Sequence, residues 1–237
     1  MEDWLTYRLS DLILFSPRTY YRMFELYHQD AWPVQLAAVA LAVVIFALLR
    51  RGDAWCAPAI AGLLFACWVW VAFAFHVGRY ATINPAGRYF AAAFMVQALL
   101  LFSTGVVRQR LTFPRWGEGA TRFAPGLFLL AIALPPLAGR AAGRTWGQVE
   151  LVGLTPGATV VATIAVLLLS SPPAPRALLV VPLAWCVIEG ATLWALESAE
   201  AWVSIVVGVA TPIAMVWRSR FLDGQSFHAT GTRASGR

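Results

Sequence analysis

The sequence predicts an all-α integral membrane protein, a bundle of about seven transmembrane helices preceded by short amphipathic helices. Of its 237 residues, 59% are hydrophobic and only 13% are charged, whereas a soluble domain has about 25% charged residues. The apolar residues also come in long runs, and the length suits one domain. Together these features exclude a soluble enzyme, a secreted disulfide-linked scaffold and a disordered chain.

Seven apolar segments have a length suited to crossing a membrane, since a hydrocarbon core about 30 Å thick needs about 20 residues of helix. The fourth is short and carries Pro135-Pro136 near its end, so it is expected to stop early, tilt or turn back into the membrane. The seven segments are Pro33–Leu49, Ala54–Phe75, Tyr89–Val107, Phe123–Ala138, Leu151–Leu169, Ala177–Leu196 and Ala201–Trp217.

Arginines between these segments predict the orientation, because short cytoplasmic loops carry the excess of positive residues. An N-terminus outside leaves Arg79, Arg88, Arg140 and Arg144 in the outer loops, beside an N-terminal tail of mixed charge. The inner side then holds the larger set, namely Arg50, Arg51, Arg108, Arg110, Arg115, Arg122, Arg176, Arg218 and Arg220. An odd number of spans then places the C-terminus inside, in the cytoplasm.

The two ends of the chain differ from the seven-helix domain at residues 32–220. Within residues 1–31, leucines and isoleucine up to Ile13 repeat at helical spacing, and Ser16-Pro17 is typical of the start of a second helix. This second helix is rich in tyrosine, so both helices are expected to lie on the outer leaflet or to pack as a cap over the bundle. Residues 221–237 are polar and rich in Gly, Ser and Thr, which predicts a disordered tail.

The charged residues and cysteines restrict the chemistry. All 18 basic residues are arginine, so a lysine Schiff base to retinal or pyridoxal phosphate and a P-loop are excluded. Cys56, Cys67 and Cys186 form no CxxC pair. We therefore expect no metal site, no cofactor and no catalytic residue, and the scattered arginines do not predict nucleic-acid binding.

Four polar side chains follow the second apolar segment, at the predicted outer edge of the membrane: His76, Arg79, Tyr80 and Asn84. Spacings of three and four residues place His76 beside Arg79 or Tyr80 on one helical face. Such a group could bind an anion, a lipid phosphate or a quinone carbonyl. An interfacial belt with a snorkelling arginine accounts for the same residues and is the commoner arrangement.

Glu189 lies near the middle of the sixth apolar segment. A carboxylate there costs about 2.5–3.5 kcal/mol on insertion scales and indicates a functional site. Coupling to a proton or cation and a hydrogen bond to Gln97 that joins two helices are equally compatible with the sequence. Arg88 and Glu150 lie at helix ends, where snorkelling or capping is expected, and His28 joins the outer cluster if the N-terminal helices fold over the bundle.

Three stretches of the chain resemble an uncharacterised family of bacterial multipass inner-membrane proteins, a domain of unknown function. They are residues 7–27, residues 75–84 and residues 152–163, with Phe15-Ser16-Pro17, Phe75-His76 and Leu154-Thr155-Pro156 among their motifs. The resemblance covers nearly the whole chain and implies an inner-membrane location, but no substrate, cofactor or catalytic residue. His76, Arg79, Tyr80 and Asn84 match the family pattern, whereas Glu189-Gly190 departs from the glycine pair that the pattern has there.

Three classes of function remain open. A transporter or channel for a small solute or ion ranks first, because of Glu189, the proline pair and the polar outer rim. An accessory or sensory subunit, bound to another membrane protein or to copies of itself, ranks second and needs no chemistry. A protein that binds a membrane lipid or quinone at the outer leaflet, or an enzyme acting there, ranks third, so the sequence favours a non-enzyme.

Overall fold

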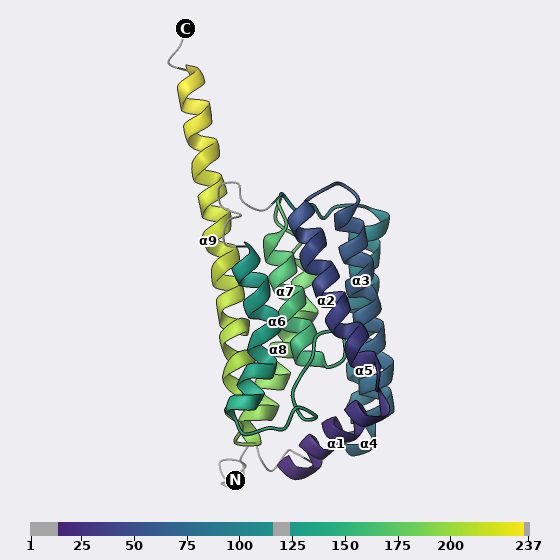
Figure 1. Ribbon diagram of the computed structural model, residues 1–237. Helices are drawn as coiled ribbons and strands as arrows, with labels where there is room; N and C mark the ends of the chain where they lie inside the picture. The colour runs from purple at the N-terminus through teal and green to yellow at the C-terminus, as the bar shows by residue number, and fades with distance from the viewer. Residues whose placement is uncertain (1–13, 116–123, 235–237) are drawn as a thin grey trace, which may run out of the picture.

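The computed structural model of the chain describes the backbone of residues 14–115 and 124–234 and the side chains of residues 14–115 and 125–218. Every regular element within these ranges is a helix (Figure 1), as the sequence predicts. In chain order the helices are α1 (Pro17–Asp30), α2 (Val34–Arg51), α3 (Cys56–Trp70), η3 (Val71–Tyr80), α4 (Ala81–Ile83), α5 (Gly87–Leu101), η4 (Phe102–Val107), α6 (Ala124–Ala141), α7 (Pro156–Leu169), α8 (Ala177–Ala195) and α9 (Ala201–Ala234).

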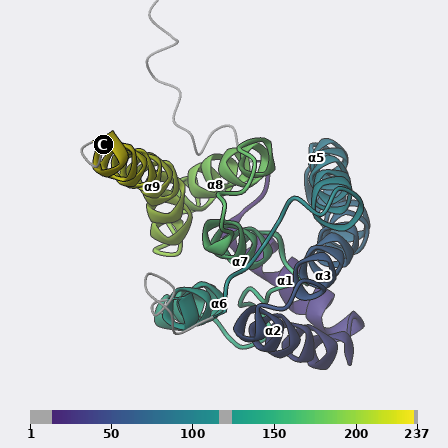
Figure 2. The same cartoon turned by 90° about the horizontal axis from the view of Figure 1, so that it is seen from above.

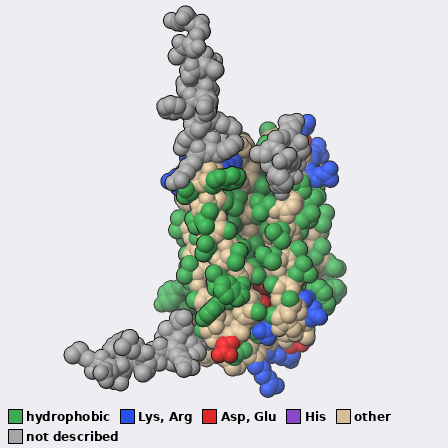
Figure 3. Space-filling model, turned by 90° about the vertical axis from the view of Figure 1, so that its left-hand side faces the viewer, with side chains coloured by type: hydrophobic (Ala, Val, Ile, Leu, Met, Phe, Trp, Pro, Cys, Tyr) green, Lys and Arg blue, Asp and Glu red, His purple; other side chains and the backbone are tan. Residues whose placement is uncertain are grey.

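Five helical stretches are long and apolar enough to cross a membrane: Val34–Arg51, Cys56–Ile83, Gly87–Val107, Ala177–Ala195 and Ala201–Arg218. Two apolar helices, Pro125–Ala141 and Pro156–Leu169, are shorter. Each of the seven predicted segments therefore coincides with a helix, and within the described residues five of them are long and apolar enough to be a span. Apolar side chains cover the middle of the face in Figure 3, and arginines lie toward its two ends.

Helix α1 lies across one end of the bundle and is packed against it (Figure 1). It begins as the sequence predicts, with Pro17 in its first turn and the Ser16 hydroxyl accepting a hydrogen bond from the backbone N–H of Thr19 at 3.2 Å. Its buried aromatic side chains face inward, and the Tyr27 hydroxyl donates to the carbonyl of Leu154 at 3.0 Å. Helix α1 therefore forms a packed cap over this end of the bundle.

Helix α7 is the centre of the bundle (Figure 2). Each of its residues from Pro156 to Leu167 is buried, and it packs against α6, α8, α9 and α3. The indole N–H of Trp68 in α3 donates to the Thr163 hydroxyl at 2.9 Å, which joins the two helices. With 14 residues, α7 is about 21 Å long, so it begins inside the bundle and not at its surface.

The structure differs from the sequence prediction at two places. Of the alternatives expected for the fourth segment, an early stop is wrong: α6 continues through Pro135 and Pro136 to Ala141, because its packing against α7 and α2 holds it together where backbone hydrogen bonds are lost. Helix α9 continues to Ala234, where a disordered tail is predicted, since extending a formed helix needs no new nucleation. The amphipathic helix predicted up to Ile13 lies outside the described residues.

Candidate functional site

Two glutamates meet at the buried start of α7. Thr155 is the residue before the helix, and the backbone N–H of Ala158 in its first turn donates to Glu150 Oε2 at 2.6 Å. The first N–H groups of a helix have no partner within the helix and carry partial positive charge, so a carboxylate is well placed there. Glu150 therefore caps α7, as its position at a helix end predicts.

Glu189 reaches the same point from α8. Its side chain is buried, and the Ser204 hydroxyl of α9 donates to Glu189 Oε2 at 2.6 Å. The other carboxylate oxygen, Oε1, has no hydrogen-bond partner among the described residues. A buried polar atom without a partner costs about 1–3 kcal/mol, which marks this oxygen as the place where a proton or a ligand would bind.

Gly157 separates the two carboxylates. A Cβ atom added at Gly157 would lie 2.3 Å from Glu150 Oε2 and also 2.3 Å from Glu189 Oε1. The two oxygens therefore lie no more than twice that distance apart. Two carboxylates so close together in a protein interior cannot both be ionised, and they titrate as a pair.

Burial and the charge of Glu189 raise the pKa of Glu150 well above its usual range. Further titratable groups lie near the pair on the elements packed around it: Tyr20 and Tyr21 from α1, Tyr80 from η3, and Glu200 from the α8–α9 turn. Arg144, from the loop after α6, pairs with Glu200. The pair is thus surrounded by groups that can exchange or stabilise a proton.

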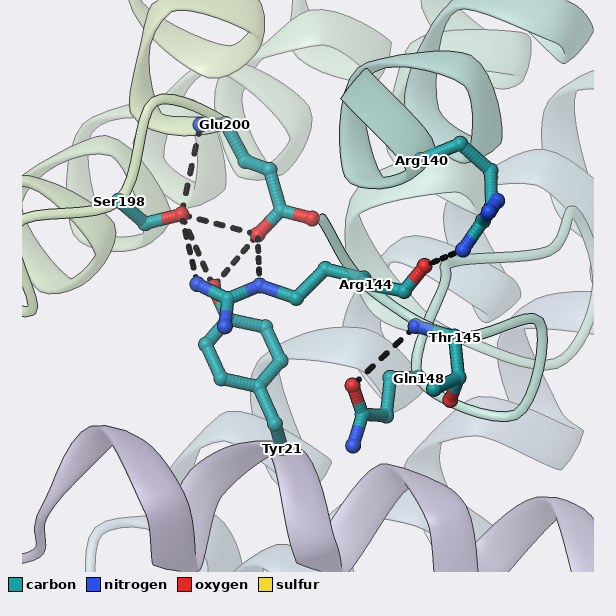
Figure 4. A network of polar contacts seen from close by, with 7 residues as sticks. All are labelled: Tyr21, Arg140, Arg144, Thr145, Gln148, Ser198 and Glu200. Atoms are coloured by element: carbon teal, nitrogen blue, oxygen red, sulfur yellow. Dashed lines mark hydrogen bonds and ion pairs between the residues drawn. The ribbon is translucent and has the colours of Figure 1, made fainter. Parts of the chain in front are cut away.

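The third glutamate, Glu200, belongs to a polar network that joins α1 to the bundle (Figure 4). The Tyr21 hydroxyl donates to Glu200 Oε2 at 2.5 Å, and the Ser198 hydroxyl donates to the same oxygen at 3.0 Å. The Arg144 guanidinium stacks over the Tyr21 ring, 3.3 Å from its centroid, and its Nε lies 3.8 Å from Glu200 Oε2. Burial and the carboxylate of Glu200 raise the pKa of Tyr21, so the phenol stays protonated and acts as a donor.

A cavity of about 30 Å³ lies among these groups, lined by all three glutamates, by Tyr20 and Tyr21, and by apolar side chains of α6, α7 and α8. This volume is on the scale of one or a few water molecules. The cavity therefore suits protons, water or a small ion, and it is too small for an organic ligand in this conformation. In the described ranges, no three His, Cys, Asp or Glu side chains are grouped as a metal site.

The four residues predicted as an outer cluster do not face one common space. His76 is buried in an aromatic cluster, with ring centroids 4.5 Å from Phe94 and 5.0 Å from Trp185. Neither nitrogen of its ring has a hydrogen-bond partner among the described residues. Arg79 instead pairs with Asp30 of α1 at the protein surface.

The other two members of the predicted cluster contact each other. The Asn84 amide donates to the Tyr80 hydroxyl at 3.4 Å, and the Tyr80 ring lies in the same aromatic cluster as His76, with centroids 6.1 Å apart. The structure thus brings His76, Tyr80 and Asn84 together and turns Arg79 away from them. The cluster joins α1, η3, α5 and α8 through packing.

Gln97 contacts a different part of α8 from Glu189. Its side-chain N–H donates to the carbonyl of Leu178 at 2.8 Å, so the Glu189–Gln97 hydrogen bond considered from the sequence is not formed. Pro182 explains this partner, because a proline four residues after Leu178 leaves its carbonyl without the usual helical donor. Gln97 therefore supplies the hydrogen bond that the Leu178 carbonyl lacks within α8.

Sequence reasoning identified Glu189 but missed the groups that meet it. The sequence predicts only snorkelling or capping for Glu150, and Glu200 belongs to an acidic turn in which such residues are common. Gly157 is the one sequence signal for this crowded site. It is the second residue of the helix that follows Thr155, where glycine costs helix stability and is expected only if a larger side chain does not fit.

The pKa of Glu150 leads to a testable dependence of stability on pH. Because its pKa in the folded protein lies above the usual value, the neutral carboxyl contributes stability that is complete below the usual pKa and is lost as pH rises through the raised one. We expect the melting temperature in detergent to fall from mildly acidic to alkaline pH. Glu150→Gln keeps an acceptor for Ala158 but cannot ionise, so it should flatten this slope, by about 2–4 °C for each kcal/mol removed. An unchanged slope would contradict the assignment.

The fold and the site define an all-helical protein with long apolar helices compatible with a membrane and with a buried group of carboxylates near one end. A family of unknown function, DUF6064, matches residues 18–226. The chain belongs to this family, which confirms the resemblance to an uncharacterised family of unknown function. No curated protein and no solved structure matches the chain.

Proposed function

We propose that this protein is a bacterial inner-membrane transporter or channel for a small solute or ion, and that Glu150 and Glu189 bind a proton whose movement is coupled to that of the solute. The observation that carries the proposal is the contact of both carboxylates with Gly157 at the buried start of α7. Acidic side chains inside a membrane protein are costly, and they occur where protons or ions are bound and released.

The start of α7 inside the bundle supports this proposal. Transporters commonly contain helices that begin or end within the membrane, and they use the exposed ends of these helices to bind ions and substrates. Here a 14-residue central helix presents its N-terminus to two carboxylates. The unpartnered Glu189 Oε1 lies at this end, where a proton would be shared with Glu150.

The proposal includes the topology predicted from the sequence: seven spans, with α6 and α7 as the two short ones, the N-terminus outside and the C-terminus in the cytoplasm. Helix α1 and the α8–α9 turn lie at one end of the bundle, and α9 extends past the other end (Figure 1). With this orientation the carboxylate pair lies nearer the outer surface. Protons would then reach it from outside by way of the cavity below α1.

Proton movement in proteoliposomes tests the proposal. Vesicles that contain the protein and an internal pH-sensitive dye are given inward gradients of sodium, potassium, ammonium, acetate, lactate or phosphate, one at a time. We expect at least one gradient to move protons, and Glu189→Gln to reduce the rate at least tenfold. The matched control is Glu197→Gln, which changes an exposed glutamate near the same end of the bundle.

Two outcomes would overturn the proposal. The first is that none of the gradients moves protons faster than in empty vesicles. The second is that Glu189→Gln moves protons at the rate of the unaltered protein, while both are inserted in equal amounts. If Glu197→Gln loses as much proton movement as Glu189→Gln, the loss comes from the change in surface charge, and Glu189 has no specific role.

A further inference from the structure

An open hollow with an excess of positive charge lies directly outside the carboxylate cavity. It measures about 520 Å³ and is lined by Arg18, Arg22 and Arg144, with Glu25 as its acidic member. Volumes of about 300–1,000 Å³ are typical of sites for small molecules. The hollow is therefore large enough for a small organic ligand, which the inner cavity is not.

Of the three arginines, Arg18 has no partner among the described residues, and Arg144 is held by long contacts that an anion could replace. Arg22 pairs with Glu25, with 2.9 Å between Nη1 and Oε2. Arg18 has no ion-pair or hydrogen-bond partner in the described part of the chain. Arg144 pairs with Glu200, with 3.8 Å between Nε and Oε2, and its Nη2 donates to the Ser198 hydroxyl at 3.5 Å. Its Nε is buried without a hydrogen-bond partner among the described residues.

Helix α1 adds a second positive contribution. Arg18 lies in the first turn of α1, which contains no acidic residue. The N-terminus of a helix carries partial positive charge, so an arginine there is unfavourable and an anion is favourable, by about 0.3–1 kcal/mol. Arg18 has no compensating partner within residues 14–115 and 125–218, which points to a bound anion, because an anion in the hollow would stabilise both the arginine and the helix end.

The hollow and the cavity share two wall residues, Tyr21 and Gln148. Arg144 stands at this shared wall, stacked on Tyr21 and facing Glu200 (Figure 4). An anion that binds Arg144 would compete with Glu200 for the guanidinium. The anion would thus weaken the Arg144–Glu200 ion pair, which lies between the hollow and the cavity that holds the Glu150–Glu189 pair.

We propose that this hollow binds a small oxyanion, a carboxylate or a phosphate, through Arg18 and Arg144. Arginine is suited to this role because its planar guanidinium donates two parallel hydrogen bonds to such groups. Resting on the function proposed above, the bound anion is the solute whose passage is coupled to the proton on the glutamate pair. Protons and a negatively charged solute would then move together, which lowers the net charge that crosses the membrane.

Binding to the purified protein in a neutral detergent tests this inference without any transport. The melting temperature is measured against increasing sodium succinate or sodium phosphate, with sodium chloride at equal ionic strength as the reference. A ligand that binds only the folded protein raises stability by RT ln(1 + [L]/Kd). We expect a saturable rise with succinate or phosphate, at least a tenfold weaker affinity in Arg18→Gln and in Arg144→Gln, and an unchanged affinity in Arg88→Gln, an exposed arginine on α5.

A second experiment distinguishes a free anion from a lipid headgroup. In it, phosphatidylglycerol is added to the micelles. If this lipid binds through Arg18 and Arg144 while the free anions do not, the oxyanion is a headgroup and the role as transported solute is overturned. The proposal also fails if no anion exceeds chloride, or if Arg18→Gln and Arg144→Gln both bind as the unaltered protein does. Glu189→Gln separates the two proposals, because only proton movement needs Glu189. This variant should still bind the anion with unchanged affinity while it no longer moves protons.

Discussion

Replacing Gly157 with alanine is expected to destabilise the protein by about 2–4 kcal/mol and to abolish proton movement. The new methyl group would lie 2.3 Å from an oxygen of each carboxylate, which is far inside van der Waals contact. Neither oxygen can move without a loss, because Glu150 Oε2 accepts the hydrogen bond from Ala158 and Glu189 is held by Ser204. Thermal unfolding in detergent measures the effect.

Gly126→Ala is the matched control for this substitution. Gly126 is exposed in the first turn of α6, and a Cβ atom added there meets nothing within 4 Å. Alanine is the better helix former by about 1 kcal/mol, so this variant should unfold at the same temperature as the unaltered protein or slightly above it. Equal melting temperatures for Gly157→Ala and Gly126→Ala would show that the carboxylates do not crowd Gly157.

The second prediction concerns His76, which is expected to be replaceable with a gain in stability. Its two ring nitrogens are buried among aromatic rings with no hydrogen-bond partner in the described segments. An unpartnered buried polar group costs about 1–3 kcal/mol. His76→Phe, or His76→Leu if the larger ring is too bulky, should therefore raise the melting temperature by about 2–12 °C, at about 2–4 °C for each kcal/mol, and leave proton movement unchanged.

Gln97→Leu serves as the contrasting variant. Gln97 is equally buried, and its Oε1 also lacks a partner in the described segments. Its side-chain N–H, however, donates to the carbonyl of Leu178, which Pro182 leaves without a helical donor. Removing this donor should lower the melting temperature, whereas removing the imidazole of His76 should raise it. A loss of proton movement in both His76→Phe and His76→Leu, with folding intact, would return His76 to the site that the sequence predicts.

The sequence was sufficient to predict the helices, because apolar runs of this length leave few alternatives. It also predicted the start of α1 at Ser16-Pro17, which depends on neighbouring residues alone. Glu189 was found because a charge in an apolar segment is conspicuous, whereas Glu150 lies in a loop where an acid is ordinary. Their meeting depends on how α7 packs against α8, and no local pattern encodes that packing.

The outer cluster shows a related limit. Spacing along a helix correctly places His76 near Tyr80, yet it does not tell whether a side chain faces a ligand or a packed interior. Arg79 turns to Asp30 because α1 folds across this end of the bundle. Contacts between segments distant in the sequence therefore decide which polar residues form the candidate site.

The enclosure of α7 has a consequence for how the protein is made. A helix of about 21 Å with no face toward lipid gains little by entering a bilayer about 30 Å thick alone. The ribosome nevertheless delivers it before α8 and α9, which supply Glu189, Ser204 and much of its surroundings. For a chain inserted in a membrane as proposed above, the order of synthesis and the order of assembly must therefore differ: α7 reaches its final place only when the last quarter of the chain has entered the membrane. The carboxylate pair forms in that closing step.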